Sequence, residues 1–584
     1  MSKFLYFLLI ILLQNSLSDL DDVSQKINLT EVLTTSYTNS IKWIGFSLPS
    51  PHIITKISWI YKDNFTQNEI LGIFEGSNEP NFIDSIPLYV FIEESTKNFI
   101  NIELKYTFKY IRYIAPLKKD VHITNIEIYG YEPLETEQNV DNFYHPTNLP
   151  LVIINTEGKM NYEQKEEKTP CNVVIINDGK MSTKQSGKAK IRGNGTKNLQ
   201  KKSFQINLDI KENILDMPAK AKKWVLLANH MDKTLIRNLV AFKIASLLGQ
   251  KYSPACKSVD LIIDGSFEGN YLLCDKIEKG ENRVELDSMD KNANEIPEIT
   301  GGYLLEVDAY ADEEEYHFYS KKGVKVTVKY PDANENQMNY IKNWFDNIEE
   351  NIYNSQNVDN IDLESFSQYF ILEEFCADID AVWSSYYITK QKNDDMMYFG
   401  PAWDFDLALD NDKRLYPTNN LTKFIFNYGP SSGTFKIFIS KLINCEQTLE
   451  YVKEKWVNIT LNDLTKENIF NFIDEQVTYL DKSVKLNFKR WDILTLVGNE
   501  AVARGSYEEQ IKHLKEFIEE RFSIFGNILL NTNTTNITNT SSFIIDIEVE
   551  SEEEKTKKKK LACHYLDTGI IHKFILITFL LLFG

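Results

Sequence analysis

Two short acidic stretches stand out in the second half of the chain. They are Asp378-Ile379-Asp380 and Asp404-Phe405-Asp406, the latter within the run Gly400 to Asp410. Mg²⁺ prefers hard oxygen ligands and, beside a nucleotide, usually takes one or two carboxylates plus the substrate phosphates. A hairpin between the stretches would gather the four carboxylates, and on a strand Asp404 and Asp406 would share one face. The pattern predicts a site for a metal-bound nucleotide.

A glycine turn lies upstream of these acids. It reads Arg192-Gly193-Asn194-Gly195-Thr196 and is followed by Lys202 and the alternating run Ser203 to Leu208. Backbone N–H groups of such a turn, with an ammonium at the start of the next strand, can surround phosphates. A solvated lysine on an edge strand is the alternative interpretation of Lys202.

Three further blocks lie between the turn and the acids: Trp224 to Asn238, Phe267 to Ile277 and Gly301 to Asp308. Together, the five blocks resemble the CotH family of atypical protein kinases. The matching motifs are an RGN turn with a lysine-bearing strand, a W-x-L-L-A-N-x-x-D-x-T-x-x-R-N helix, a G-x-Y-x-L strand, a G-G-Y-L-L-E strand and the G-P-x-W-D-F-D hallmark. The resemblance covers about residues 150 to 525.

The resemblance implies an ATP-dependent transfer of phosphate to Ser or Thr of secreted proteins, with Mg²⁺ or Mn²⁺. Asp404 would hold the metal with help from Asp406, and Asp380, or else Asp378, would act as the base or orient the acceptor hydroxyl. The candidates for phosphate contacts are Lys202, Arg192 and Arg237, and either arginine could instead pair with acids structurally.

The expected fold class is multidomain, with an N-terminal all-β jelly-roll sandwich followed by an α+β, bilobal, atypical protein-kinase-like domain over residues 150–530. Alternation and turn signals predict strands at 151–155, 172–177 and 259–265. Helices are expected at 361–375 and 507–525. This order predicts a β-rich lobe, then an α-rich lobe, with a cleft between them.

Residues 19–133 show strand alternation and no helical period. Four blocks, Trp43 to Phe46, Phe74 to Phe82, Tyr110 to Tyr113 and Ile126 to Gly130, resemble a discoidin-like, galactose-binding-like domain. The resemblance implies a glycan or lipid ligand, and a purely structural spacer is the alternative. Residues 134–149 are expected to be a linker.

The two ends of the chain predict export and anchoring. Residues 1–18 have the apolar run and small-x-small site of a signal peptide. Residues 531–562 are predicted to be a glycosylated, charged stalk, and 563–584 an apolar signal for a GPI anchor on the cell membrane, or else a short transmembrane tail. We therefore expect a glycoprotein that passes through the secretory pathway to the cell surface.

Charge and cysteine content limit the partners. The formal net charge is -20, which disfavours nucleic acid as a partner. The six cysteines form no C-x-x-C pair and no zinc-ligand spacing, and one or two disulfides are plausible in an oxidising compartment.

Three functions fit these features. The first is a secretory-pathway or cell-surface Ser/Thr protein kinase that uses ATP. The second is a surface adhesin or ligand-binding pseudokinase that uses the same fold. The third is a glycan hydrolase with paired carboxylates.

Overall fold

The computed structural model describes residues 24–36, 41–62, 69–94, 97–134, 141–428 and 433–533. The predicted signal peptide, the anchor signal and nearly all of the stalk lie outside these residues. The chain forms two compact units. The first comprises the described residues up to Leu235 together with Ala255–Lys276 and Glu475–Thr495, and the second comprises Ile236–Pro254, Ile277–Asp474 and the described residues from Leu496 onward.

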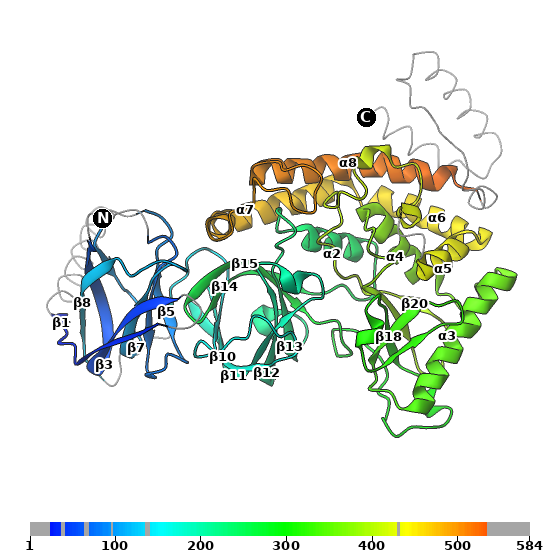
Figure 1. Ribbon diagram of the computed structural model, residues 1–584. Helices are drawn as coiled ribbons and strands as arrows, with labels where there is room; N and C mark the ends of the chain where they lie inside the picture. The colour runs from blue at the N-terminus through cyan, green and yellow to red at the C-terminus, as the bar shows by residue number, and fades with distance from the viewer. Residues whose placement is uncertain are drawn as a thin grey trace, which may run out of the picture. The chain divides into compact units, whose positions relative to one another are not determined.

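The first unit begins with an eight-stranded all-β domain (Figure 1). Its strands are β1 (Gln25–Lys26), β2 (Glu31–Ser36), β3 (Lys42–Tyr61), β4 (Ile73–Ser77), β5 (Ile86–Val90), β6 (Phe99–Asn101), β7 (Thr107–Ile114) and β8 (Ile123–Tyr131). The first half of β3 pairs with β2 and β7, and its second half pairs with β6 and β8. The pairing shifts between Ser47 and His52, where Pro49 and Pro51 cannot donate to a ladder. One long strand thereby connects most strands of the domain into a single sheet.

The core of this domain contains a cluster of aromatic side chains. Trp59 in the second half of β3 packs against Phe74 of β4 and Phe91, with ring centroids 5.5 and 5.4 Å apart. All three side chains are buried. Burial of these large rings contributes to the apolar stabilisation of the domain.

One buried carboxyl group makes the stability of this domain depend on pH. Burial raises the pKa of Glu69 to about 7, and its carboxylate accepts a hydrogen bond from the Tyr113 hydroxyl. Because the folded pKa lies above the unfolded value near 4.5, the protonated form favours folding. This contribution is complete below pH 4.5, falls as pH rises to about 7 and is then lost.

We therefore expect Glu69→Gln to flatten the pH dependence of unfolding. Between pH 4.5 and pH 7.5 the wild type should lose about 3 kcal/mol more than the variant, because each pKa unit corresponds to about 1.4 kcal/mol. Urea unfolding of both proteins at the two pH values measures this difference. Parallel pH profiles would show that Glu69 does not titrate in this way.

The second part of the first unit is a closed barrel in the order β10-β11-β12-β13-β15-β14-β9. The strands are β9 (Leu151–Asn155), β10 (Thr169–Asn177), β11 (Lys180–Arg192), β12 (Ser203–Glu212), β13 (Ala221–Leu227), β14 (Cys256–Ile263) and β15 (Ser266–Asp275). The strands predicted at 151–155, 172–177 and 259–265 are confirmed: β9 matches the predicted range, β10 and β14 each begin three residues earlier, and β14 ends two residues earlier. The predicted glycine turn joins β11 to β12, and Gly193 has φ +96° there.

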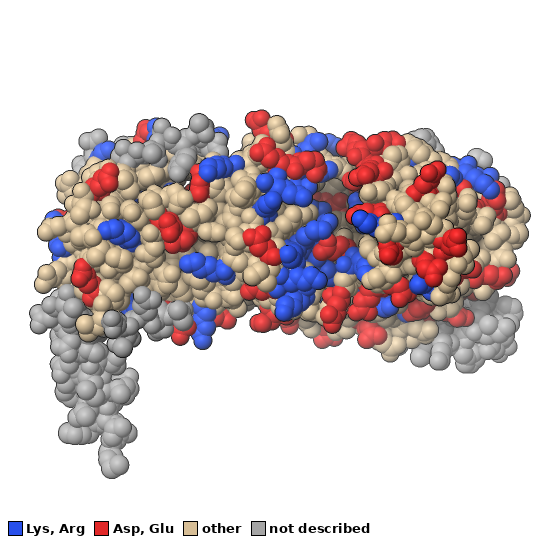
Figure 2. All heavy atoms as spheres, turned by 90° about the horizontal axis from the view of Figure 1, so that it is seen from below, with Lys and Arg blue, Asp and Glu red and all other residues tan. Residues whose placement is uncertain are grey.

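The outer face of the barrel carries lysines that are not adjacent in sequence. The strand register places Lys188 beside Asn207, and Asn207 beside Lys223, and both lysines are exposed. Figure 2 shows that Lys and Arg side chains gather in one area of the visible face, whereas Asp and Glu are more widely spread. The net charge of the chain therefore conceals local basic surface.

The second unit combines a five-stranded sheet with helices. The sheet has the order β17-β18-β16-β19-β20. Its strands are β16 (Tyr303–Val307), β17 (His317–Tyr319), β18 (Lys325–Tyr330), β19 (Tyr386–Lys390) and β20 (Tyr398–Phe399). The helices are α2 (Arg237–Leu247), α3 (Glu335–Ser355), α4 (Leu363–Cys376), α5 (Thr434–Ile443), α6 (Glu446–Asn462), α7 (Lys466–Arg490), whose second half belongs to the first unit, and α8 (Tyr507–Asn531).

Helix α4 is the central helix of the second unit, because it packs against α2, α6 and α8 (Figure 1). It begins at Asp362, whose carboxylate accepts a hydrogen bond from the Ser365 N–H, as expected of an N-cap. It ends where Ala377 adopts φ +54°. The helices predicted at 361–375 and 507–525 are confirmed as α4 and α8.

The helix expected over Trp224 to Asn238 is wrong. Trp224 to Leu227 belong to β13, and helix α2 begins only at Arg237. All four residues of the run Trp-Val-Leu-Leu are apolar. A short apolar run of this kind fits a fully buried strand as well as a helix. Trp224 and Val225 pair with Asp275 and Cys274 of β15, so sheet pairing decides the outcome.

Candidate functional site

The four predicted carboxylates lie in two loops of the second unit. Asp378 and Asp380 follow α4, and Asp404 and Asp406 follow β20. The strands β19 and β20 between them are antiparallel, which confirms the predicted hairpin. The expectation that Asp404 and Asp406 lie on a strand is wrong, because Asp404 has φ +73°, a conformation that strands do not adopt.

The Asp404 loop is fixed by backbone contacts to the helices beside it. The Phe405 N–H donates to the Asn238 side-chain oxygen of α2 at 2.8 Å, and the Leu409 N–H donates to the Cys376 carbonyl of α4 at 2.6 Å. Trp403 and Phe405 pack on Phe242 of α2, at centroid distances of 6.2 and 6.4 Å. The alternation of buried aromatic and acidic residues therefore anchors the loop and leaves Asp404 exposed.

The carboxylates are close enough to influence one another. Burial is the largest cause that raises the pKa of Asp378 well above its usual range, and the charges of Asp380, Asp404 and Asp406 raise it further. Asp378 also accepts a hydrogen bond from the Asp380 N–H at 2.9 Å. Repulsion among neighbouring carboxylates is relieved when a cation binds.

Strand β16 adds two acids that the sequence did not single out. Asp308 accepts hydrogen bonds from the hydroxyls of Ser384, at 3.1 Å, and Thr327, at 3.2 Å. Burial raises the pKa of Glu306, the charges of Asp308 and Asp404 raise it further, and its ion pair with Lys329 at 2.9 Å opposes the shift. Glu306 ends the Gly-Gly-Tyr-Leu-Leu-Glu motif and Asp308 follows two residues later, so the signal was present in the sequence. We call Glu306, Asp308, Asp378, Asp380, Asp404 and Asp406 the acidic cluster.

Asp380 has a cationic partner, Arg414, at 2.7 Å. The same guanidinium donates to Asp412 from Nε at 2.8 Å, and these two carboxylates raise the pKa of Arg414. The Arg414 side chain is 44% exposed, so it lies at the surface of the acidic cluster. No sequence motif indicated this residue, because its role depends on how the loop after β20 folds back.

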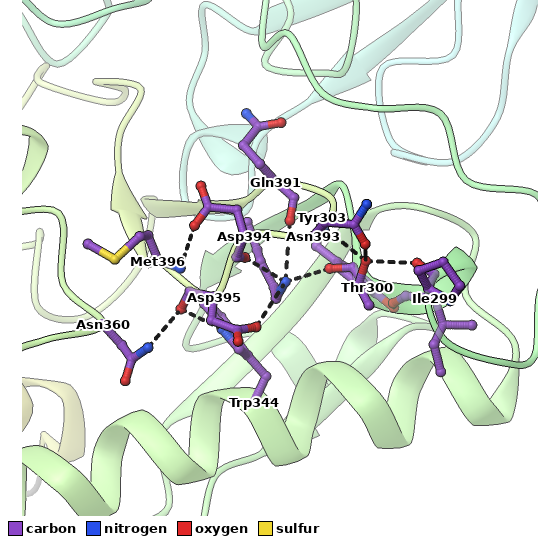
Figure 3. Close-up of polar contacts among 12 residues, drawn as sticks. Ile299, Thr300, Tyr303, Trp344, Asn360, Gln391, Asn393, Asp394, Asp395 and Met396 are labelled. Atoms are coloured by element: carbon purple, nitrogen blue, oxygen red, sulfur yellow. Dashed lines mark hydrogen bonds and ion pairs between the residues drawn. The ribbon is translucent and has the colours of Figure 1, made fainter.

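A buried lysine supports the β19–β20 hairpin. Lys390 Nζ donates to the carbonyls of Thr300 at 2.5 Å, Asp394 at 2.8 Å and Gln391 at 3.3 Å, and it lies 3.9 Å from the Asp395 carboxylate. Figure 3 shows that Thr300, Gln391, Asp394 and Asp395 lie close together. Because burial of an ammonium without partners is costly, this network fixes the connection that precedes the Asp404 loop.

The predicted phosphate-binding residues lie in both units. Lys202 and Arg192 belong to the first unit, on either side of the glycine turn, whereas Arg237 and the acidic cluster belong to the second. Lys202 Nζ donates to the carbonyls of Lys197, at 2.6 Å, and Leu199, at 3.3 Å. In this structure its ammonium therefore binds backbone carbonyls just after the glycine turn. The roles of all three residues toward phosphate stay predictions.

Arg237 is fully buried at the start of α2, and its Nε–H donates to the Leu409 carbonyl at 3.2 Å. This contact holds the end of the Asp404 loop, which fits the structural alternative for this residue. The neighbour of Lys202, Lys201, is also fully buried and donates to the Asn487 side chain at 2.9 Å. Burial lowers the pKa of Lys201 to about 7.

The acidic cluster suits a hard divalent cation in its donor chemistry. Within the described ranges, no group of three or more His, Cys, Asp or Glu side chains is already arranged to hold a metal ion. Mg²⁺ beside a nucleotide needs only one or two carboxylates, because phosphate oxygens and water complete its shell. Asp404, exposed among carboxyl groups that repel one another, fits this requirement, with Asp406 next to it.

The chain belongs to the CotH family: the model of that family, described as CotH kinase protein, matches residues 189–525, more than half of the 584-residue chain. The match includes the glycine turn and the acidic cluster.

Comparison with solved structures gives distant neighbours. One is CBM62 from Clostridium thermocellum Xyl5A, which is 20% identical, covers 18% of this chain and 97% of its own, and has a TM-score of 0.17. Another is a truncated AlyQ with CBM32 and alginate lyase domains, which is 13% identical over 32% of this chain and 54% of its own, with a TM-score of 0.16. A search of curated proteins finds no match. TM-scores this low support no statement about a ligand.

Within the described part of the chain, no helix is long and apolar enough to cross a membrane.

Proposed function

We propose that the protein is an atypical Ser/Thr protein kinase of the secretory pathway or cell surface. Membership of the CotH family supports an ATP-dependent reaction, and the acidic cluster is the single observation that carries the proposal. In this proposal the closed barrel of the first unit and the second unit are the two lobes of a bilobal kinase-like fold, and the N-terminal all-β domain is separate from them. The acceptor is a Ser or Thr hydroxyl of a secreted or surface protein.

The residues have distinct roles in this proposal. Asp404 and Asp406 hold Mg²⁺ or Mn²⁺, which when bound neutralises charge on the ATP phosphates. Asp380 orients the acceptor hydroxyl and accepts its proton, with Asp378 as the alternative. Lys202 and Arg192 contact the phosphates, and Arg237, which is fully buried, positions the Asp404 loop. Phosphoryl transfer depends mainly on position and charge, so these few groups suffice.

The remaining segments complete the proposal. Residues 1–18 direct export, the C-terminal segment carries glycans and an anchor, and the N-terminal all-β domain binds a glycan or lipid near the substrate. Phosphorylation occurs during secretory transit, where ATP is available.

The test is transfer of label from γ-labelled ATP to a mixture of secreted proteins, with Mg²⁺ or Mn²⁺, followed by phosphoamino acid analysis. We expect label on Ser or Thr. Lys202→Ala should raise the KM for ATP about tenfold, because it removes one charge contact to phosphate. Lys222→Ala, an exposed lysine on β13, is the matched control and should leave KM unchanged.

Two results would contradict the proposal. Folded wild type that neither binds ATP nor transfers label would leave the adhesin or pseudokinase as the better account. Cleavage of glycans without ATP would favour the hydrolase.

A further inference from the structure

Two cysteines lie opposite each other on neighbouring strands of the barrel. Cys256 is the first residue of β14, Cys274 is the last but one of β15, and the register pairs them directly. Their sulfur atoms are 2.7 Å apart. Residues directly opposite on antiparallel strands point to the same side of the sheet, so the pairing brings the two thiols together.

The position of the two cysteines in the strand ladder favours a disulfide bond between them. The Asp275 N–H donates to the Ala255 carbonyl at 2.9 Å, so these adjacent residues lie at a hydrogen-bonded position of the ladder. Because the two kinds of position alternate, Cys256 and Cys274 occupy a non-hydrogen-bonded position, where Cα atoms are about 4.5 Å apart. Disulfides span Cα separations of about 4.4 to 6.8 Å, so no backbone movement is needed.

The other described cysteines differ from this pair. None of the five described cysteines is in a disulfide in this structure, but Cys171, Cys376 and Cys445 are buried in separate elements, β10, α4 and the start of α6. Cys445 donates to the carbonyls of Gln356 and Lys441, each at 3.5 Å. Within the described residues, Cys256 and Cys274 are therefore the two cysteines that the fold brings into contact.

We propose that Cys256 and Cys274 form a disulfide in the mature protein. The oxidant is a small-molecule or protein disulfide, such as glutathione disulfide. The thiolate of one cysteine attacks it and releases one thiol, and the second cysteine then displaces the other thiol. The protein loses two protons and two electrons, and the oxidant leaves as two thiols. An oxidising compartment, as in the proposed secretory route, supplies such an oxidant.

The bond would link the two ends of one segment of the first unit, Ala255–Lys276. The chain enters it between Pro254 and Ala255 and leaves it between Lys276 and Ile277, in each case within two or three residues of one of these cysteines. A disulfide would prevent the start of β14 and the end of β15 from separating. It would also close a short loop, which reduces the entropy of the unfolded chain.

The test starts from full-length protein with reduced thiols, equilibrated with a glutathione and glutathione disulfide buffer. The protein is then denatured, alkylated, digested and analysed by mass spectrometry without reduction. Denaturation before alkylation matters, because burial and the neighbouring Cys274 raise the pKa of Cys256 and slow its reaction in the folded state. We expect a peptide with Cys256 linked to a peptide with Cys274, which disappears on reduction.

A second measurement separates this bond from a chance linkage. Reduction should lower the midpoint of thermal unfolding of the oxidised wild type by about 5 °C. The double variant Cys256→Ser/Cys274→Ser should show no shift on reduction, whereas Cys171→Ser should behave as wild type. Complete alkylation of both cysteines after equilibration with glutathione disulfide would overturn the proposal, whether or not the variants fold.

Discussion

Asp404→Asn should lower the rate of ATP-dependent phosphate transfer about 10³-fold and leave the fold intact. The variant removes the negative charge that we assign to the metal, and a ligand to a catalytic cation contributes several kcal/mol in the transition state. Asparagine tolerates the positive φ at this position, and its side-chain oxygen can still accept from the Ser385 hydroxyl, which lies 3.2 Å from Asp404. The kcat for labelled ATP is the measurement.

The matched control is Asp359→Asn, an exposed aspartate in the turn before α4. It should change neither kcat nor the unfolding temperature, because surface substitutions usually cost less than about 0.5 kcal/mol. Equal activity of Asp404→Asn and wild type would remove Asp404 from the site. A large fall in the unfolding temperature of Asp404→Asn would instead indicate a structural role.

Arg112→Met should destabilise the N-terminal all-β domain by about 3 to 5 kcal/mol. Arg112 donates to the same Glu75 oxygen from Nε at 2.9 Å and from a terminal nitrogen at 2.8 Å, and their side chains are 4% and 0% exposed. Its guanidinium also lies 4.2 Å from the centre of the Phe82 ring. The variant leaves a buried carboxylate without its cation. Urea unfolding of the full chain measures the loss.

Two further variants isolate the cause. Arg112→Met combined with Glu75→Leu should recover much of the loss, because the unpaired charge is then gone. Lys26→Met breaks an exposed ion pair with Glu127 and should leave the stability nearly unchanged, because solvent screens such a pair. If Arg112→Met lowered the free energy of unfolding as little as Lys26→Met, the buried pair would contribute little to stability.

Local sequence patterns predicted the helices and strands whose hydrophobic period matches the structure that they adopt in the fold. Strand β9 and helices α4 and α8 follow their patterns within about two residues at the start. The region Trp224 to Leu227 could not be assigned in this way, because its apolar run has no period and its strand pairing with β15 involves residues far along the chain. Long-range pairing of this kind is not encoded locally.

The sequence predicted only part of the acidic site, because local motifs can be recognised in a sequence and long-range contacts cannot. Asp378, Asp380, Asp404 and Asp406 stand in dense motifs, so their residue types and spacing drew attention. Arg414 has no motif, and only the folded loop brings it to 2.7 Å from Asp380. The strand expected at Asp404 failed because the positive φ there is a property of the loop, which follows from its contacts with α2 and α4.

The most direct test of the acidic cluster as a metal–nucleotide site is the binding of Mn²⁺, followed by electron paramagnetic resonance, in the presence of a non-hydrolysable ATP analogue. Our account predicts that wild type binds Mn²⁺ more tightly with the analogue than without it, and that Asp404→Asn weakens this binding at least about tenfold. Equal binding by wild type and Asp404→Asn, or no binding by folded wild type, would contradict it.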